Sequence, residues 1–138
     1  MKGAIKSMRP NDRGLIVVAK ANVKAAKRDL EENDEVFVNF AMFNISQAVE
    51  KTIKFLCACQ DIPYDFSHFV GRLADKLIEA NVIIPELILN SIPEYSTWAT
   101  RSRYTADQMA QRSYVQKHLS KVENWITKIE NKFGISKK

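Results

Sequence analysis

Histidine can move a proton and arginine can stabilise the charge of a phosphate, and one pair of these residues near the C-terminus has a spacing that could combine the two. The chain has two histidines, His68 and His118. Arg112 precedes His118 with five residues between them, and such a pair combines an imidazole that moves a proton with a guanidinium that stabilises negative charge. In a straight helix, however, a six-residue step leaves two side chains about 120° apart. The pair would therefore converge only through a kink or across a dimer axis.

A second group of candidates combines arginines with aromatic side chains. Arg101 and Arg103 closely follow Trp98, and Tyr104 comes directly after them. Guanidinium groups bind phosphate with two parallel hydrogen bonds, and aromatic rings stack on nucleic acid bases. These residues are therefore candidates for binding a ligand. A pairing of Arg103 with Glu50 inside the protein is the alternative.

The stretch from Val36 to Gln60 predicts the helix around which these candidates are arranged. Apolar side chains recur there at steps of three and four, as on one face of an α-helix. They are Val38, Met42, Ile45, Val49, Ile53 and Leu56. Further apolar residues widen this face, so the helix must be covered on several sides. Its polar strip, Gln47, Glu50, Lys51 and Lys54, is either a ligand-binding edge or a buried network that joins helices.

The composition favours a helical protein with a modest positive charge. The 138 residues include four Gly and four Pro, and the net charge is +5. This charge is compatible with a nucleic acid or phosphate ligand, but a basic surface in contact with water alone would also explain it. The same two interpretations apply to the basic ridge of Lys20, Lys24 and Lys27. Cys57 and Cys59 diverge by about 200° on a helix and have no Cys or His cluster beside them. We therefore expect no disulfide and no metal site.

The flanking segments predict further helices. The first should run from Asn11 or Asp12 to Asn33 and pack antiparallel to the central helix after a very short connection. The remaining expected elements are a third helix over 68–81, a short fourth helix over 85–92, a turn or ordered loop over 94–105 and a last helix from 105–107 to 133. Pro93 should end or bend the fourth helix, and Gly134 should stop the last one.

These elements predict one all-α domain over residues 1–138, an up-and-down bundle of four to five helices. Residues 1–10 are expected to be a frayed leader, and residues 135–138 a basic tail. No apolar run of about 18 residues occurs, so no transmembrane helix is expected. The lack of a signal peptide and the reduced cysteines favour a cytoplasmic protein, and no cofactor is expected.

The central segment closely resembles the signature helix of HEPN domains, a family named for nucleotide binding in higher eukaryotes and prokaryotes. Residues 41–56 read AMFNISQAVEKTIKFL and match an aromatic residue followed by Gln-Ala-Val-Glu-Lys, an apolar residue, Lys and further apolar residues. Three other pieces resemble the family's pattern in order and spacing. They are residues 26–30 in the first helix, 67–69 at the start of the third and 101–104 before the last. The resemblance covers most of the chain and implies a HEPN-like bundle.

The resemblance also implies a link to nucleotides or RNA, often beside a separate nucleotidyltransferase partner, and a common tendency to dimerise. Many members are RNA-cleaving toxins that carry an Arg, then four to six residues, then a His. Arg112 and His118 meet that spacing. The motif is nevertheless expected at the entry to the last helix, where Arg103 has no His within range.

We therefore predict a non-catalytic module rather than an enzyme. It would bind a nucleotide or an RNA phosphate, a nucleotidyltransferase partner, or both, as a homodimer. The alternative is a metal-independent ribonuclease toxin of a toxin–antitoxin pair that uses Arg112 and His118. An apolar dimer interface should draw on the central and last helices, and elution as a monomer at micromolar concentration would contradict it.

Overall fold

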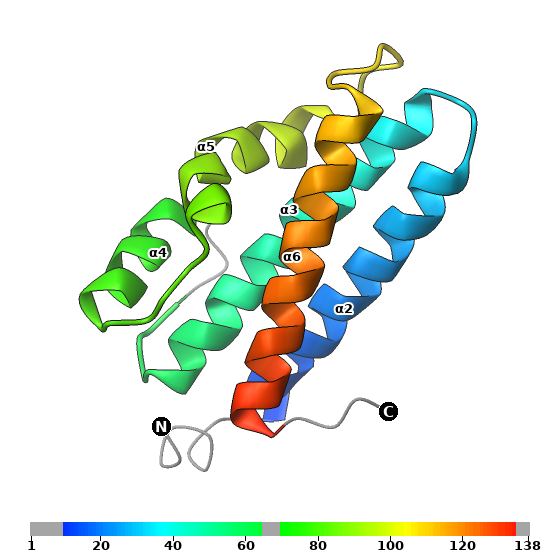
Figure 1. Cartoon of the computed structure of the whole chain (residues 1–138). Helices are drawn as coiled ribbons and strands as arrows, with labels where there is room; N and C mark the ends of the chain where they lie inside the picture. The colour runs from blue at the N-terminus through cyan, green and yellow to red at the C-terminus, as the bar shows by residue number, and fades with distance from the viewer. Residues whose placement is uncertain (1–9, 65–69, 135–138) are drawn as a thin grey trace.

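The computed structural model describes residues 10–64 and 70–134, and within these ranges all regular secondary structure is α-helical. The helices are α2 (Pro10–Glu31), α3 (Val36–Cys59), α4 (Val70–Glu79), α5 (Glu86–Arg101) and α6 (Arg112–Phe133). Figure 1 shows α2 on one side of α3, α4 and α5 on the other side, and α6 crossing in front of α3. The predicted all-α bundle of four to five helices is confirmed.

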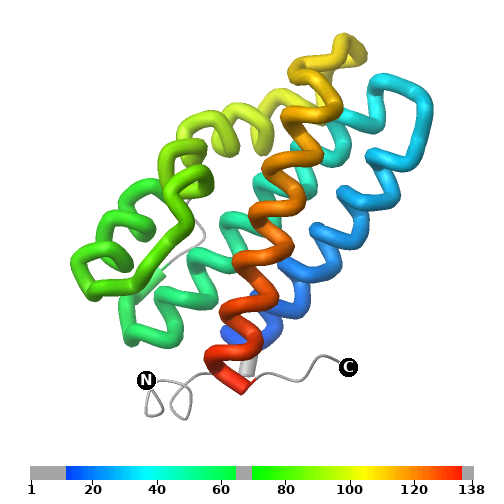
Figure 2. The backbone as a smooth tube through the Cα atoms, in the orientation of Figure 1, coloured from blue at the N-terminus to red at the C-terminus, as the bar shows by residue number. Residues whose placement is uncertain are grey.

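In the described part of the chain, four helices cover α3, and the sequence of α3 explains why. Every residue of the predicted apolar face is buried, and so are Phe55 and Cys59 beside that face. All four of the other described helices contact α3, and the backbone path in Figure 2 shows them around it. A helix apolar around most of its circumference needs this arrangement. The predicted central helix over 36–60 agrees with the observed one to within a residue.

Helices α2 and α3 form the predicted antiparallel hairpin. The connection is short, and the Asp34 carboxylate accepts a hydrogen bond of 3.1 Å from the Val36 N–H at the start of α3. The α2 residues that face the core are Ile16, Ala19, Val23 and Ala26, all buried. Polar contacts reinforce the hairpin, because Asn44 accepts a bond from Asn22 at 3.1 Å and donates one to Asp29 at 3.0 Å.

The fourth predicted helix was too short, because α5 continues through Pro93 to Arg101. Proline has no N–H to donate to the carbonyl four residues earlier, so it bends a helix or ends it. Here the Pro93 ring lies on the exposed side of α5, where it displaces no core side chain. Tyr95 and Trp98 beyond it are buried, and burying them favours continuing the helix. Figure 1 shows α5 bending along its course.

The last helix starts at Arg112, later than the predicted start at 105–107. Asn39 of α3 explains the difference. Its side-chain amide donates to the carbonyls of Thr105 at 3.2 Å and Asp107 at 2.8 Å, and its side-chain oxygen accepts from the Met109 N–H at 3.0 Å. These three bonds satisfy backbone groups of an irregular segment over residues 102–111, here called the Asn39-bound loop. At its other end, α6 stops at Gly134, which is left-handed with φ of 66° as predicted.

The start of the third predicted helix lies partly outside the described residues. Helix α4 is described from Val70 and ends at Glu79, close to the predicted end at Asn81. The predicted start of this helix at His68 falls within residues 65–69, outside the described ranges. Within the described ranges, no helix is both long and apolar enough to cross a membrane.

Replacing Asn39 by alanine should loosen the Asn39-bound loop and destabilise the protein. The substitution leaves three backbone groups without partners, so we expect the free energy of unfolding to fall by about 2–4 kcal/mol. Urea unfolding measures this loss, and faster tryptic cleavage after Arg103 reports the loosened loop. The control is Asn124→Ala on the exposed face of α6, which should change stability by less than about 0.5 kcal/mol. An unchanged urea midpoint and unchanged cleavage would contradict the role of Asn39.

Candidate functional site

A pocket of about 520 Å³ lies between α3 and α5. Residues of α3 and α5 form most of its lining. Val70 at the start of α4 also contributes, and so do Arg103 and Tyr104 of the Asn39-bound loop. The lining residues are Phe43, Ser46, Gln47, Val49, Glu50, Val70, Ile92, Tyr95, Ser96, Ala99, Thr100, Arg103 and Tyr104. An apolar lining with a few polar groups, at this volume, is typical of a small-molecule site.

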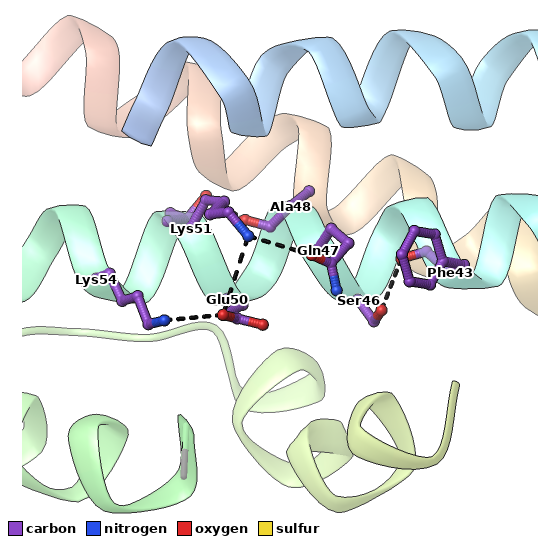
Figure 3. A network of polar contacts seen from close by, with 8 residues as sticks. Phe43, Ser46, Gln47, Ala48, Glu50, Lys51 and Lys54 are labelled. Carbon is purple, nitrogen blue, oxygen red and sulfur yellow. Dashed lines mark hydrogen bonds and ion pairs between the residues drawn. The ribbon is translucent and has the colours of Figure 1, made fainter. Parts of the chain in front are cut away.

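The polar strip of α3 forms a connected network along one edge of the pocket (Figure 3). The Lys54 ammonium donates to Glu50 Oε2 at 2.8 Å, and the Lys51 ammonium donates to Gln47 Oε1 at 3.1 Å. Lys51 also lies 3.9 Å from Glu50 Oε2. Glu50 is 7% exposed and Lys54 is 4% exposed, whereas Gln47 and Lys51 are half-buried. A buried charge needs a partner, so Glu50 and Lys54 hold each other while Gln47 and Lys51 form the more open part.

Arg103 lies across the pocket rim on an aromatic support. Its guanidinium carbon is 4.4 Å from the centre of the Phe43 ring and 5.3 Å from the centre of the Tyr104 ring. A guanidinium over an aromatic face is attracted electrostatically. Arg103 has no hydrogen-bond or ion-pair partner in the described part of the chain, and Tyr104 is 77% exposed. Both side chains are therefore open to a ligand at the rim, whereas Arg101 is exposed but does not line the pocket.

Arg112 has a different position, at the junction of α2 and α6. Its guanidinium donates to the carbonyl oxygens of Leu30 at 2.6 Å and Glu32 at 2.9 Å. Carbonyls at a helix C-terminus lack intrahelical donors, and a cation is favourable there. Arg112 thus caps α2 and joins it to the start of α6.

His118 is fully buried between α6 and α5. Its Nδ1 shares a hydrogen bond of 2.6 Å with the Tyr95 hydroxyl, and the rings of Tyr95, Trp98 and Tyr114 surround it. Nε2 has no hydrogen-bond partner among the described residues. Burial is the main cause that lowers the pKa of His118, and the nearby Lys117 charge lowers it further, while Glu94 opposes the shift. The folded protein therefore favours the neutral imidazole.

The structure brings together some of the sequence candidates and separates others. Gln47, Glu50, Arg103 and Tyr104 line one pocket, and Lys51 and Lys54 are bonded to two of them. Arg112 and His118 contact different elements. Sequence reasoning missed Phe43 as the support for Arg103, although its position one helical turn before Gln47 places both on one face. It also missed Asn39 and Tyr95, which no spacing in the sequence links to their distant partners.

The two cysteines are buried thiols of low reactivity. Burial raises the pKa of Cys57 to about 11 and that of Cys59 to about 12, so both stay protonated near neutral pH. Among the described residues, no three His, Cys, Asp or Glu side chains are grouped as metal ligands would be.

Comparison with known families agrees with this architecture. The model of the HEPN domain family matches residues 13–132, most of the chain. The protein therefore belongs to the HEPN domain family, as the signature in α3 predicted. Searches among curated proteins and among solved structures found no significant match.

Because the His118 imidazole is buried, we expect the free energy of unfolding to decrease at acid pH. Because the pKa of His118 is lowered from its ordinary value of 6.5, the unfolded chain binds a proton there more readily than the folded chain. The contribution of His118 to stability is complete above about pH 6.5 and decreases as the pH falls below it. We expect urea unfolding to show a larger loss of stability between about pH 7.5 and about pH 5.5 in the wild type than in His118→Gln. Equal losses in the two proteins would contradict the assignment.

Proposed function

We propose that this HEPN protein is a non-catalytic module that binds a nucleotide or an RNA phosphate in the pocket between α3 and α5. The observation that carries the proposal is the convergence of two distant sequence motifs on one pocket. Gln47 and Glu50 come from the signature helix, and Arg103 and Tyr104 follow α5. No local pattern in the sequence requires these residues to share a cavity.

The chemistry of the pocket suits a nucleotide. The Arg103 guanidinium has free N–H donors for phosphate oxygens. The exposed ring of Tyr104 beside it offers a stacking surface for a base. Because Lys51 donates to Gln47 Oε1, the amide nitrogen of Gln47 remains as a donor for a ligand oxygen. These features support a ligand that carries both an anionic group and a planar ring.

The surroundings of Arg112 and His118 support a binding role over catalysis. The Arg112 guanidinium is engaged with two backbone carbonyls, and the His118 ring is enclosed by aromatic side chains. A general base must come within hydrogen-bond reach of its substrate. The ribonuclease alternative therefore stays a prediction that needs a rearrangement of both side chains.

The proposal includes assembly as a homodimer and binding of a nucleotidyltransferase as a second kind of partner. Exposed aromatic side chains support an interface on the central and last helices, since Phe40 of α3 and Tyr114 of α6 are more than a third exposed. Exposed aromatic residues are common at protein interfaces.

Removing the Arg103 side chain should weaken nucleotide binding, whereas removing Arg101 should not. A ligand present at 100 times its Kd stabilises a protein by about 2.7 kcal/mol, so a thermal shift panel of nucleoside phosphates identifies a ligand. Loss of a charge-assisted hydrogen bond should then raise Kd by roughly ten- to a hundredfold in Arg103→Ala. Arg101→Ala is the matched control, because that exposed arginine lies two residues away and outside the pocket. Equal weakening by both variants, or no stabilisation by any nucleotide, would contradict the proposed pocket.

The same preparations distinguish binding from catalysis. We expect the wild type to leave RNA uncleaved, because no imidazole of the described residues reaches the pocket. Cleavage by the wild type that is lost in His118→Gln would contradict this and support the ribonuclease alternative.

A further inference from the structure

The outer face of α6 carries a row of lysines. Lys117, Lys121, Lys128 and Lys132 are all exposed. At 100° per residue they fall within an arc of about 60° on the helix, and the row extends over about 22 Å. We call these four residues the lysine stripe. In Figure 1, α6 crosses in front of α3, and no other helix covers its outer side.

The carboxylates of α6 point away from the lysine stripe. The helix has two acidic residues, and both pair with lysines of α2. Glu130 is buried with its Oε2 2.8 Å from the Lys20 ammonium, and Glu123 forms an ion pair with Lys27. The basic ridge of α2 is therefore partly neutralised by α6, while the lysine stripe faces solvent with no carboxylate of its own helix beside it.

This arrangement is unfavourable for the isolated helix. Lys117 and Lys121 are four residues apart, and so are Lys128 and Lys132. Like charges at this spacing destabilise a helix. The residues between them on the same side are uncharged hydrogen-bonding types, including Asn124 and Asn131. A solvated surface needs no such segregation of charge, whereas a polyanion partner would compensate the repulsion.

We propose that the lysine stripe binds the phosphate backbone of a nucleic acid without reading its sequence. Lysines with interspersed Asn and Ser side chains are the donor set that contacts phosphates and sugars. An extended row also matches a linear array of charges, and each neutralised phosphate releases counterions. No residue of α6 lines the pocket between α3 and α5, so this surface is separate from the proposed nucleotide site and does not depend on it.

The salt dependence of RNA binding tests the lysine stripe. The probe is a fluorescently labelled single-stranded RNA of 20 nucleotides of mixed sequence, with binding followed by anisotropy in the full chain. Four phosphate contacts predict that affinity falls about 50-fold between about 50 mM and 200 mM salt. In Lys121→Gln/Lys128→Gln, two contacts remain, and the fall should be only about sevenfold. The matched control, Lys76→Gln/Arg101→Gln, loses the same charge from exposed positions on α4 and α5 and should behave as the wild type.

Each other outcome overturns the proposal. Equal effects of the two double variants would mean that binding depends on net charge alone. Absence of RNA binding at about 50 mM salt would mean that the lysine stripe is not a nucleic acid binding surface. Competition by polyaspartate as strong as by unlabelled RNA at equal charge would assign the lysine stripe to acidic proteins instead. Loss of RNA binding in Arg103→Ala with no effect of the stripe variant would overturn the stripe and leave the pocket standing. Loss of the nucleotide thermal shift in the stripe variant would overturn the separation of the lysine stripe from the pocket.

Discussion

The Glu50 carboxylate and the Lys54 ammonium are buried 2.8 Å apart on the helix that every other described helix contacts. Each charge needs the other in this position, because a buried ion without a partner costs several kcal/mol of stability. Figure 3 shows both side chains directed toward the side of α3 where α5 lies. Glu50 also lines the pocket, so the arrangement that keeps the two charges paired fixes one wall of the candidate site. Lys51 extends the same network to Gln47 at the more open edge.

Local patterns in the sequence predict most of the fold, and long-range contacts decide the rest. The apolar spacing of α3 and the short connection before it are sufficient to predict the central helix and its hairpin with α2. The end of the fourth helix is not predictable in this way, since it depends on the burial of Tyr95 and Trp98 beyond Pro93. The start of α6 depends on Asn39, whose partners lie 66 to 70 residues further along the chain.

The candidate site shows the same division. Residue types alone single out Arg103 and Tyr104, and the polar strip of the central helix singles out Gln47 and Glu50. Only the packing of α5 against α3 places these residues in one pocket. Arg112 and His118 have the right chemistry and spacing for phosphate cleavage. Their surroundings differ from what spacing suggests, because one caps α2 and the other is enclosed between α5 and α6. The chemical role open to each of these side chains therefore depends on its surroundings as well as on its residue type.

The late position of α6 in the chain has a consequence during protein synthesis. Helix α6 covers part of α3, yet it lies more than 50 residues after α3 ends. At ribosomal rates of about 5–20 residues per second, the part of α3 that α6 covers stays exposed for on the order of ten seconds after it is made. A nascent chain in this state exposes the surface that chaperones recognise. The hairpin with α2 shortens the exposed stretch, because it forms from residues already translated.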